Sequence, residues 1–494
     1  MKYDRIVVIM LVVLFGYTPV ISGHATTSTN SADNLHVTAQ FYDSIFEGDK
    51  PNIAKLNLFF TKMPKGGDLH HHYTGTIYAE TYLDWVSQKG WYIDKCTFRI
   101  VKKRENKRCD ITVQALLEDD ALYRKLLTLW SDKDYGNHFH DQPPPDSNFF
   151  NTFGYFGDVS DEYMDIGLIV IKQRALKENV VYIETMLSRT GVKSSDYFDS
   201  VRTKQLNQQL REAKSQQRVN KLLEQIATVL IGEKRFGVSV NEFISMVENN
   251  HRGIDSHNFV MRYQTYASRT KDPIQVFVDL LSGYLAAKNS PLIVGVNIVA
   301  PENNFVALAD YSLHMMMFNY LSNKYPNINH SLHAGELTLG MVRPKDLTFH
   351  IEEALNIAHA KRIGHGVDLP YEQHSVELLE GLKNNAVIEI NLTSNEFILG
   401  VKNNEHPYLI YSSYGVPLVI STDDSGVSRN NLSHEYRLLA TRYKPSYMRI
   451  KEYVYNSIEY SFLPSEDKYR LKKLLDDKFS IFESEMANLY KKFK

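Results

Sequence analysis

Short apolar segments rich in β-branched residues alternate with stretches of helical period along most of this chain. Continuous apolar runs of this kind are typical of parallel strands that are buried on both faces. Alternating strands and helices in this number predict either a (β/α)₈ barrel or a doubly wound sheet. The candidate strands, of which the third has the weakest pattern, are Gly66–His70, Val180–Met186, Phe236–Val240, Leu292–Val299, His330–His333, Arg362–Val367, Ala386–Asn391 and Pro417–Ser421.

Polar residues follow several of these strands at the carboxyl end, and a barrel carries its active site at that end. They stand in the four motifs Asp68–His72, Ser331–Glu336, Arg362–Gly366 and Ser421–Asp424. Their position favours the barrel over the doubly wound sheet, although the periodicity alone does not separate the two.

Each motif taken alone also has an ordinary structural interpretation. His70 and His72 share one face of a strand and could bind one metal, but an H-x-H pair is weak evidence. Glu336 could be an acidic residue in the first turn of a helix. His365 could be a hydrogen-bonded residue in a turn, and Asp423 a helix cap. Taken together, three histidines and an aspartate form a nitrogen and oxygen ligand set that suits Zn²⁺ and leaves a position for water.

The four motifs together resemble the adenosine deaminase family. The matching patterns are D-L-H-x-H-x-x-G over Asp68–Gly75, S-L-H-A-G-E over Ser331–Glu336, R-I-G-H-G over Arg362–Gly366 and S-T-D-D over Ser421–Asp424. The resemblance runs from about Met63 to the region of Tyr436, with further similarity at Val294–Asn297 and Thr393–Asn395. Within the family, the lead-in Met63–Gly67 and the N-terminal features described below are more similar to the secreted, growth-factor-related branch.

The resemblance implies a (β/α)₈ barrel that hydrolytically deaminates adenosine to inosine and ammonia, with one zinc ion per chain. It implies that Glu336 protonates the purine ring, and that His365 orients and deprotonates the attacking water. The family's purine-contacting glycine falls at Ala300. The remaining assignments are His70, His72, His333 and Asp423 as zinc ligands, and Asp424 as the partner of a purine ring nitrogen.

Sugar recognition is where the sequence departs from the family. Relatives hold the ribose with acidic residues after the second histidine, whereas this chain has Tyr73 and Thr74 at those substrate-binding positions. We therefore expect both adenosine and 2′-deoxyadenosine to be accepted. Two alternatives stay open: a deaminase of another 6-aminopurine, and a catalytically weak, growth-factor-like binding protein on the same barrel. A nucleotide substrate would need basic residues for its phosphate, and none is evident beside the motifs.

The N-terminus has the pattern of a signal peptide over residues 1–25. Lys2 and Arg5 precede the apolar run Ile6–Phe15, and small residues follow. The alternative, a membrane anchor, is disfavoured because Gly16–Pro19 interrupt the run before it reaches about 20 residues. We expect a secreted or periplasmic protein with no membrane contact after cleavage. A helical extension is predicted over residues 26–62, followed by the barrel over 63–494.

The chain has two cysteines, Cys96 and Cys109, in an insertion at about 90–112 that follows the first strand. In an oxidising compartment such a pair predicts a local disulfide, the alternative being two unrelated thiols. The cysteine-ligated zinc site of cytidine-type deaminases is excluded, because it needs cysteines three positions apart.

The net charge of −2 gives no general attraction to nucleic acid or membranes, so we expect a small purine nucleoside as the partner. A basic cluster at Lys102–Arg108 could bind a polyanion, although a solvated loop is the commoner explanation. A homodimer is left open.

Overall fold

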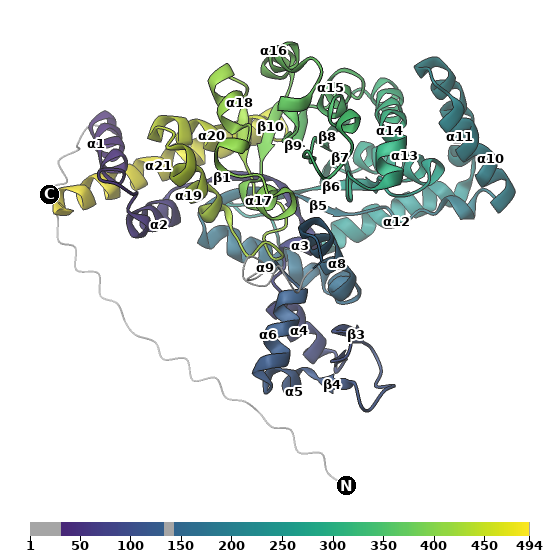
Figure 1. Ribbon diagram of the computed structural model, residues 1–494, viewed down its shortest axis with the longest axis horizontal. Helices are drawn as coiled ribbons and strands as arrows, with labels where there is room; N and C mark the ends of the chain where they lie inside the picture. The colour runs from purple at the N-terminus through teal and green to yellow at the C-terminus, as the bar shows by residue number, and fades with distance from the viewer. Residues whose placement is uncertain (1–30, 133–142, 494) are drawn as a thin grey trace, which may run out of the picture.

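The computed structural model describes residues 31–132 and 143–493, and its centre is a barrel of eight parallel strands surrounded by helices (Figure 1). The strands are β1 (Gly66–His72), β5 (Val180–Ser188), β6 (Val260–Ser268), β7 (Ile293–Val299), β8 (Asn329–Ala334), β9 (Arg362–His365), β10 (Val387–Ile390) and β11 (Leu418–Ile420), hydrogen-bonded in that order. A parallel bridge between His71 and Asp423 joins the first strand to the segment after the last. The predicted (β/α)₈ barrel is confirmed, and it closes at two of the predicted motifs.

The prediction of Phe236–Val240 as a strand is wrong, and the third barrel strand is β6. The segment lies in α12 (Lys234–Asn250), where Phe236, Val240 and Val247 are buried at helical spacing. The sequence pattern does not indicate strand β6, because polar side chains interrupt its apolar residues. Gln264 and Thr265 on this strand are both almost completely buried, so the barrel interior is polar at this point.

Helices connect successive strands and form the outer layer. The barrel helices are α9 (Met164–Lys177), α10 (Ser200–Glu212), α11 (Gln216–Gly232), α12, α13 (Pro273–Asn289), α14 (Phe305–Lys324), α15 (His350–Asn356), α16 (Ser375–Asn385), α17 (Leu392–Leu399), α18 (Tyr408–Tyr414), α19 (Leu432–Tyr443) and α20 (Tyr447–Glu459). The stretch from Ser200 to Ile231 forms two helices, α10 and α11. Ser215 caps the second of them by accepting a hydrogen bond from the Arg218 N–H.

Strand β1 begins with two glycines because a helix crosses it closely. A Cβ on Gly66 would lie 2.4 Å from both the Ser457 hydroxyl and the Val454 carbonyl oxygen of α20. Gly66 also has φ of +63°, in the left-handed region that glycine tolerates best. The Gly67 N–H then donates to the Ser457 hydroxyl at 2.6 Å, which fixes the strand that carries His70 and His72.

Between β1 and β5 the chain leaves the barrel and forms a projecting module (Figure 1). After the short helix α3 (Tyr73–Thr76), the module consists of α4 (Ala79–Gln88), β2 (Tyr92–Asp94), β3 (Arg99–Val101), β4 (Asp110–Thr112), α5 (Val113–Leu117) and α6 (Asp120–Leu129), and α8 (Pro145–Glu162) leads back to the barrel. Strands β2, β3 and β4 form an antiparallel sheet in the order β3-β2-β4. The predicted disulfide between Cys96 and Cys109 is present, with their Cα atoms 5.6 Å apart.

The two ends of the described chain pack against each other beside the barrel (Figure 1). Helices α1 (Ser31–Ser44) and α2 (Ile53–Lys62) meet the C-terminal α21 (Ser465–Phe493) through aromatic side chains. The ring of Phe59 lies 5.1 Å from that of Phe482 and 6.1 Å from that of Phe41. The expected signal peptide lies outside the described residues. Within residues 31–132 and 143–493, every helix is too short or too polar to cross a membrane.

Candidate active site

The carboxyl ends of the barrel strands surround one cavity of about 730 Å³. A cavity of this size at this end of a barrel is the usual location of a small-molecule site. It is lined by His72, Thr74, Phe149, Phe150, Phe153, Gly157, Met186, Arg189, Tyr266, Thr270, Val299, Ala300, Pro301, Asn304, His333, Glu336, His365, Asp423 and Asp424. All four sequence motifs therefore meet at one place.

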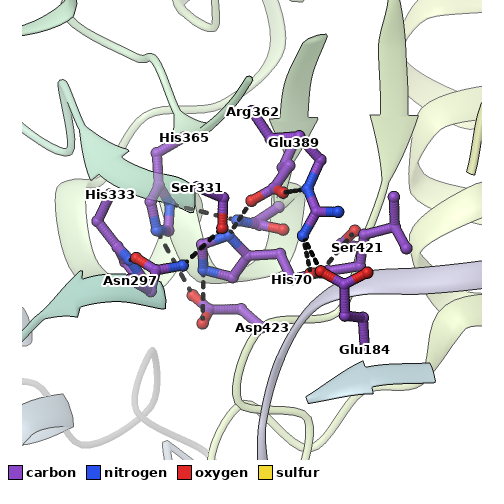
Figure 2. Close-up of polar contacts among 12 residues, drawn as sticks. His70, Glu184, Asn297, Ser331, His333, Arg362, His365, Glu389, Ser421 and Asp423 are labelled. Carbon is purple, nitrogen blue, oxygen red and sulfur yellow. Dashed lines mark hydrogen bonds and ion pairs between the residues drawn. The ribbon is translucent and has the colours of Figure 1, made fainter. Parts of the chain in front are cut away.

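The four predicted metal ligands converge at the base of this cavity. The Nε2 atoms of His70 and His72 lie 3.4 Å and 3.3 Å from Oδ1 of Asp423. The Nε2 atoms of His72 and His333 are 3.2 Å apart. One ligand atom from each of the four residues lies within 4.8 Å of every other. Figure 2 shows His70, His333 and Asp423 gathered there, with His365 beside them.

The protonation of two of these histidines is fixed by their other ring nitrogens. Nδ1 of His70 lies 2.7 Å from Oε2 of Glu389, a carboxylate that accepts its proton. Nδ1 of His333 lies 3.0 Å from Oδ1 of Asn297, whose amide nitrogen donates to Ser331. In both rings Nδ1 is therefore taken up by its partner, and Nε2 is the atom directed toward the shared point, as in ligated histidines.

The charges around the four converging ligand residues also favour a bound cation. Burial disfavours a charged imidazole, yet the negative charges of Asp423 and Glu389 outweigh it and raise the pKa of His70 to about 10. The buried carboxylates thus favour a positive charge at Nε2 of His70, which a proton supplies in the absence of a metal and a bound cation would supply in its place. The residues present thus fit a divalent cation such as Zn²⁺, which histidine and carboxylate ligands suit.

A buried arginine holds the carboxylate behind His70. Arg362, which is completely buried, donates from Nε to Oε1 of Glu389 at 2.6 Å and from Nη2 to Glu184 (Figure 2). Gln264 donates to Glu184 at 2.8 Å and accepts a hydrogen bond from Asn297 at 3.1 Å. A continuous polar network therefore links the supports of His70 and His333 through the barrel interior.

Glu336 is placed at the cavity by a second carboxylate. The N–H groups of Gly335 and Glu336 donate to Glu302 at 3.2 Å and 3.0 Å. Burial, followed by the negative charge of Asp423, raises the pKa of Glu336 well above its usual range. This shift favours the protonated carboxyl group, which is the form that a general acid needs.

His365 lies beside Glu336, with its Nε2 3.6 Å from Oε1 of that residue and 4.0 Å from Oδ2 of Asp423. Burial lowers the pKa of His365 to about 3, and the charge of His70 adds to the effect. His365, Asp423 and Ala300 have φ of 71°, 59° and 84°. Non-glycine residues held in the left-handed region gather at functional sites.

Three of the four predicted substrate-binding residues line the cavity, and one does not. Asp424, Ala300 and Thr74 line the cavity, and burial together with the charge of Asp423 raises the pKa of Asp424 well above its usual range. Ala300 takes the backbone conformation that favours the glycine found there in relatives. Tyr73 is not brought to the site: it is buried, and its hydroxyl donates to the Ser160 carbonyl at 3.1 Å.

Several residues of the site were not predicted from the sequence. Glu184, Glu389 and Asn297 each interrupt an apolar strand, and a charged or amide residue in a buried strand must have a partner, so a signal was present. The aromatic wall formed by Phe149, Phe150 and Phe153 comes from α8, outside the strand motifs. Arg189, at the end of β5, is the one lysine or arginine among the described residues that line the cavity.

Comparison with known proteins gives one consistent family. Residues 147–478 match the family model described as adenosine deaminase. An adenosine deaminase of Clostridium acetobutylicum is 31% identical over 208 residues, which span 42% of this chain and 56% of that protein. An adenine deaminase of Rhizobium leguminosarum is 28% identical over 241 residues, 48% of this chain and 69% of that protein. The chain thus spans little more than half the length of the first of these relatives.

Solved structures share the fold at low sequence identity. The N6-methyl-AMP deaminase of Arabidopsis thaliana superposes with a TM-score of 0.53 and 17% identity, covering 85% of this chain and 98% of that one. An amidohydrolase of Burkhoderia ambifaria with bound Zn has a TM-score of 0.53 and 14% identity, covering 90% and 97%. These likenesses extend the barrel assignment to nearly the whole described chain.

Proposed function

Because the chain belongs to the adenosine deaminase family, we propose that it is a zinc-dependent hydrolase that removes the 6-amino group of a purine nucleoside, adenosine or 2′-deoxyadenosine. The observation that carries this proposal is the convergence of His70, His72, His333 and Asp423 beside two carboxyl groups with raised pKa. Those four residues would hold one zinc ion. When bound there, zinc would lower the pKa of a water molecule toward about 7, so that a nucleophile is available at neutral pH.

The remaining groups suit the chemistry of an aromatic amidine. Glu336 holds a proton that it can give to the ring nitrogen beside the reacting carbon, which makes that carbon more electrophilic. Asp424, also kept protonated, can donate a hydrogen bond to a second ring nitrogen. His365 orients the attacking water. Attack forms a bond between the water oxygen and the ring carbon, which becomes tetrahedral. The Glu336 carboxylate, having given its proton to the ring, takes one water proton, and the other passes to the amino group, which leaves as ammonia when its bond to carbon breaks.

A second candidate, a purine nucleoside 5′-monophosphate, is favoured by Arg189. Its side chain is 44% exposed and Nη1 lies 3.8 Å from Oδ2 of Asp279, so the guanidinium keeps donors available at the cavity. An arginine of this kind can bind a phosphate. N6-methyl-AMP deaminase and adenine deaminase occur among the solved structures and relatives above, so the substrate class has to be measured.

The test is an activity panel with metal analysis on the same sample. We expect about one zinc per chain and ammonia release from adenosine and 2′-deoxyadenosine. Glu336→Gln should keep the zinc and lose at least ~10²-fold in turnover, because it removes the proton donor and no ligand. His333→Ala should lower the zinc content.

Full activity in metal-free protein would refute the mechanism, and activity on adenine or a nucleotide alone would move the function to the alternative. Metal content without ammonia release from any purine would favour the binding-protein alternative.

We also propose that the protein is secreted or periplasmic and belongs to the growth-factor-related branch. The support is the disulfide in the projecting module, since disulfides persist in oxidising compartments. N-terminal sequencing of the exported protein, with cleavage expected near residue 25, tests this.

The partners beyond the substrate are proposals too. Lys102 of the basic cluster ion-pairs Glu162 at 3.7 Å, and the residues that follow it to Arg108 are exposed. Heparin affinity in low salt would test polyanion binding, and light scattering would test a homodimer.

A further inference from the structure

A chain of hydrogen bonds leads from a backbone N–H to His365, passing through two residues that lie outside the cavity. The N–H of Tyr408 lies 3.1 Å from Nδ1 of His406. Nε2 of His406 lies 3.0 Å from Oδ1 of Asn395, and Nδ2 of Asn395 lies 2.9 Å from Nδ1 of His365. His406 and Asn395 are both buried.

The donor and acceptor roles along this chain of hydrogen bonds are determined by its first member, the Tyr408 N–H. A backbone N–H can only donate, so Nδ1 of His406 must accept the Tyr408 hydrogen bond. Burial lowers the pKa of His406 to about 3, so the ring is neutral and carries its one proton on Nε2. That proton is donated to Oδ1 of Asn395, which sets the orientation of the amide.

With the amide so oriented, Asn395 presents its NH₂ group to Nδ1 of His365. Nδ1 of His365 is then an acceptor, and the ring proton must lie on Nε2. That atom points toward Glu336 and Asp423 and has no hydrogen-bond partner among the described residues.

We infer that His406 is a positioning residue of the site, which acts through Asn395 to hold the proton of His365 on Nε2. A protonated Nε2 donates a hydrogen bond to the attacking water but has no lone pair to take its proton. His365 is thus an orienting donor, in contrast to the deprotonating role implied by the family resemblance. The catalytic consequence rests on the proposed function, whereas the position of the proton does not.

The position of the proton can be observed directly, without any turnover. Histidine-selective ¹⁵N labelling and long-range ¹H–¹⁵N spectra distinguish a protonated ring nitrogen from an unprotonated one, and the His365→Asn variant identifies the signals of His365. We expect Nε2 protonated and Nδ1 unprotonated in the metal-free wild-type protein. A proton on Nδ1 would overturn the inference.

Two variants of His406 separate the hydrogen bond from simple packing. His406→Gln can keep an N–H directed at Asn395, whereas His406→Leu fills the space without a donor. Loss of an outer-shell partner costs about 10–100-fold, so we expect a fall of that size in kcat for His406→Leu. KM should change little, because His406 does not line the cavity. His406→Gln should recover most of the activity, and equal losses in the two variants would overturn the inference.

The outcomes keep the two proposals apart. If no purine is deaminated, the proposed function fails, while the wild-type spectrum still decides the position of the proton. If deamination occurs and Nδ1 carries the proton, only the role of His406 fails. Should His406→Leu not fold, the wild-type spectrum and His406→Gln still provide the test.

Discussion

Replacing Arg362 by methionine should destabilise the fold more than any change to a surface ion pair. Arg362 is completely buried, contacts the carboxylates of Glu184 and Glu389, and stacks over the ring of Phe462 at 3.9 Å. Methionine fills a similar volume without charge. The substitution therefore removes the cation that the two buried carboxylates share.

The expected loss is about 3–5 kcal/mol in the free energy of unfolding, the usual effect of removing one partner of a buried ion pair. That is a large fraction of the roughly 5–15 kcal/mol by which most domains are stable. His70 would also lose the fixed orientation of Glu389, so zinc affinity should fall together with stability.

The sign of the pH dependence follows from Glu389. Burial alone would raise its pKa, but the charges of Arg362 and His70 outweigh burial and hold the pKa below the usual value. In the wild-type protein, Glu389 therefore contributes stability above its unfolded pKa of about 4.5, and this contribution is lost as the pH falls. In Arg362→Met the loss of the arginine charge raises the pKa of Glu389 relative to the wild-type protein, so the destabilisation should be greatest near neutral pH and smaller in mild acid.

Urea unfolding of metal-free protein, followed by fluorescence, measures the effect without the linkage to metal binding. The matched control is Arg449→Met, which breaks an exposed pair with Glu452 and should cost less than about 1 kcal/mol. An Arg362→Met variant as stable as Arg449→Met at neutral pH would refute the reasoning.

Three further outcomes are expected. Gly75→Ala should sharply reduce kcat/KM for adenosine, because its Cβ would lie 1.5 Å from Oδ1 of Asp424; unchanged kinetics would contradict the placement of Asp424. Ala300→Gly should raise the unfolding free energy by about 1 kcal/mol in denaturant titration, since glycine tolerates the left-handed backbone there, and a loss of stability would count against that strain. Reduction of the Cys96–Cys109 disulfide, worth about 3 kcal/mol in the chain-entropy model, should increase amide exchange in the projecting module and leave the zinc content unchanged; two free thiols in unreduced peptides would contradict the pairing.

Most barrel strands could be predicted from the sequence because they are short apolar runs or, like β1, carry a recognisable motif, and the prediction failed at β6, which has neither feature. The apolar runs that end near His333 and His365 stood out, whereas β6 carries Gln264 inside the barrel. Its partners come from strands distant in sequence, so no local pattern shows that this amide is satisfied. The buried apolar residues of α12, by contrast, include a short run that is compatible with either a strand or a helix.

In the candidate site too, residues in local motifs could be predicted, whereas residues brought together only by the fold could not. The ligands and Glu336 stand in compact motifs, so a short stretch of sequence was enough to predict them. Tyr73 was misplaced because α3 starts immediately after β1 and turns its side chain toward Ser160. Arg189 becomes relevant only when the barrel closes and brings the end of β5 to the cavity.

The cavity is lined by two parts of the molecule, the barrel and helix α8. The barrel strands and the segments that follow them provide the candidate ligands and Glu336. Helix α8 provides the aromatic wall and is tied to the projecting module by the hydrogen bond from Arg99 to the Gly154 carbonyl at 3.0 Å. Changes of sequence in α8 and the module can therefore reshape the aromatic wall while leaving those residues in place, and under the proposed function this would change which purine is preferred. A laboratory library confined to Phe149–Phe153 would explore substrate choice on an intact chemical centre.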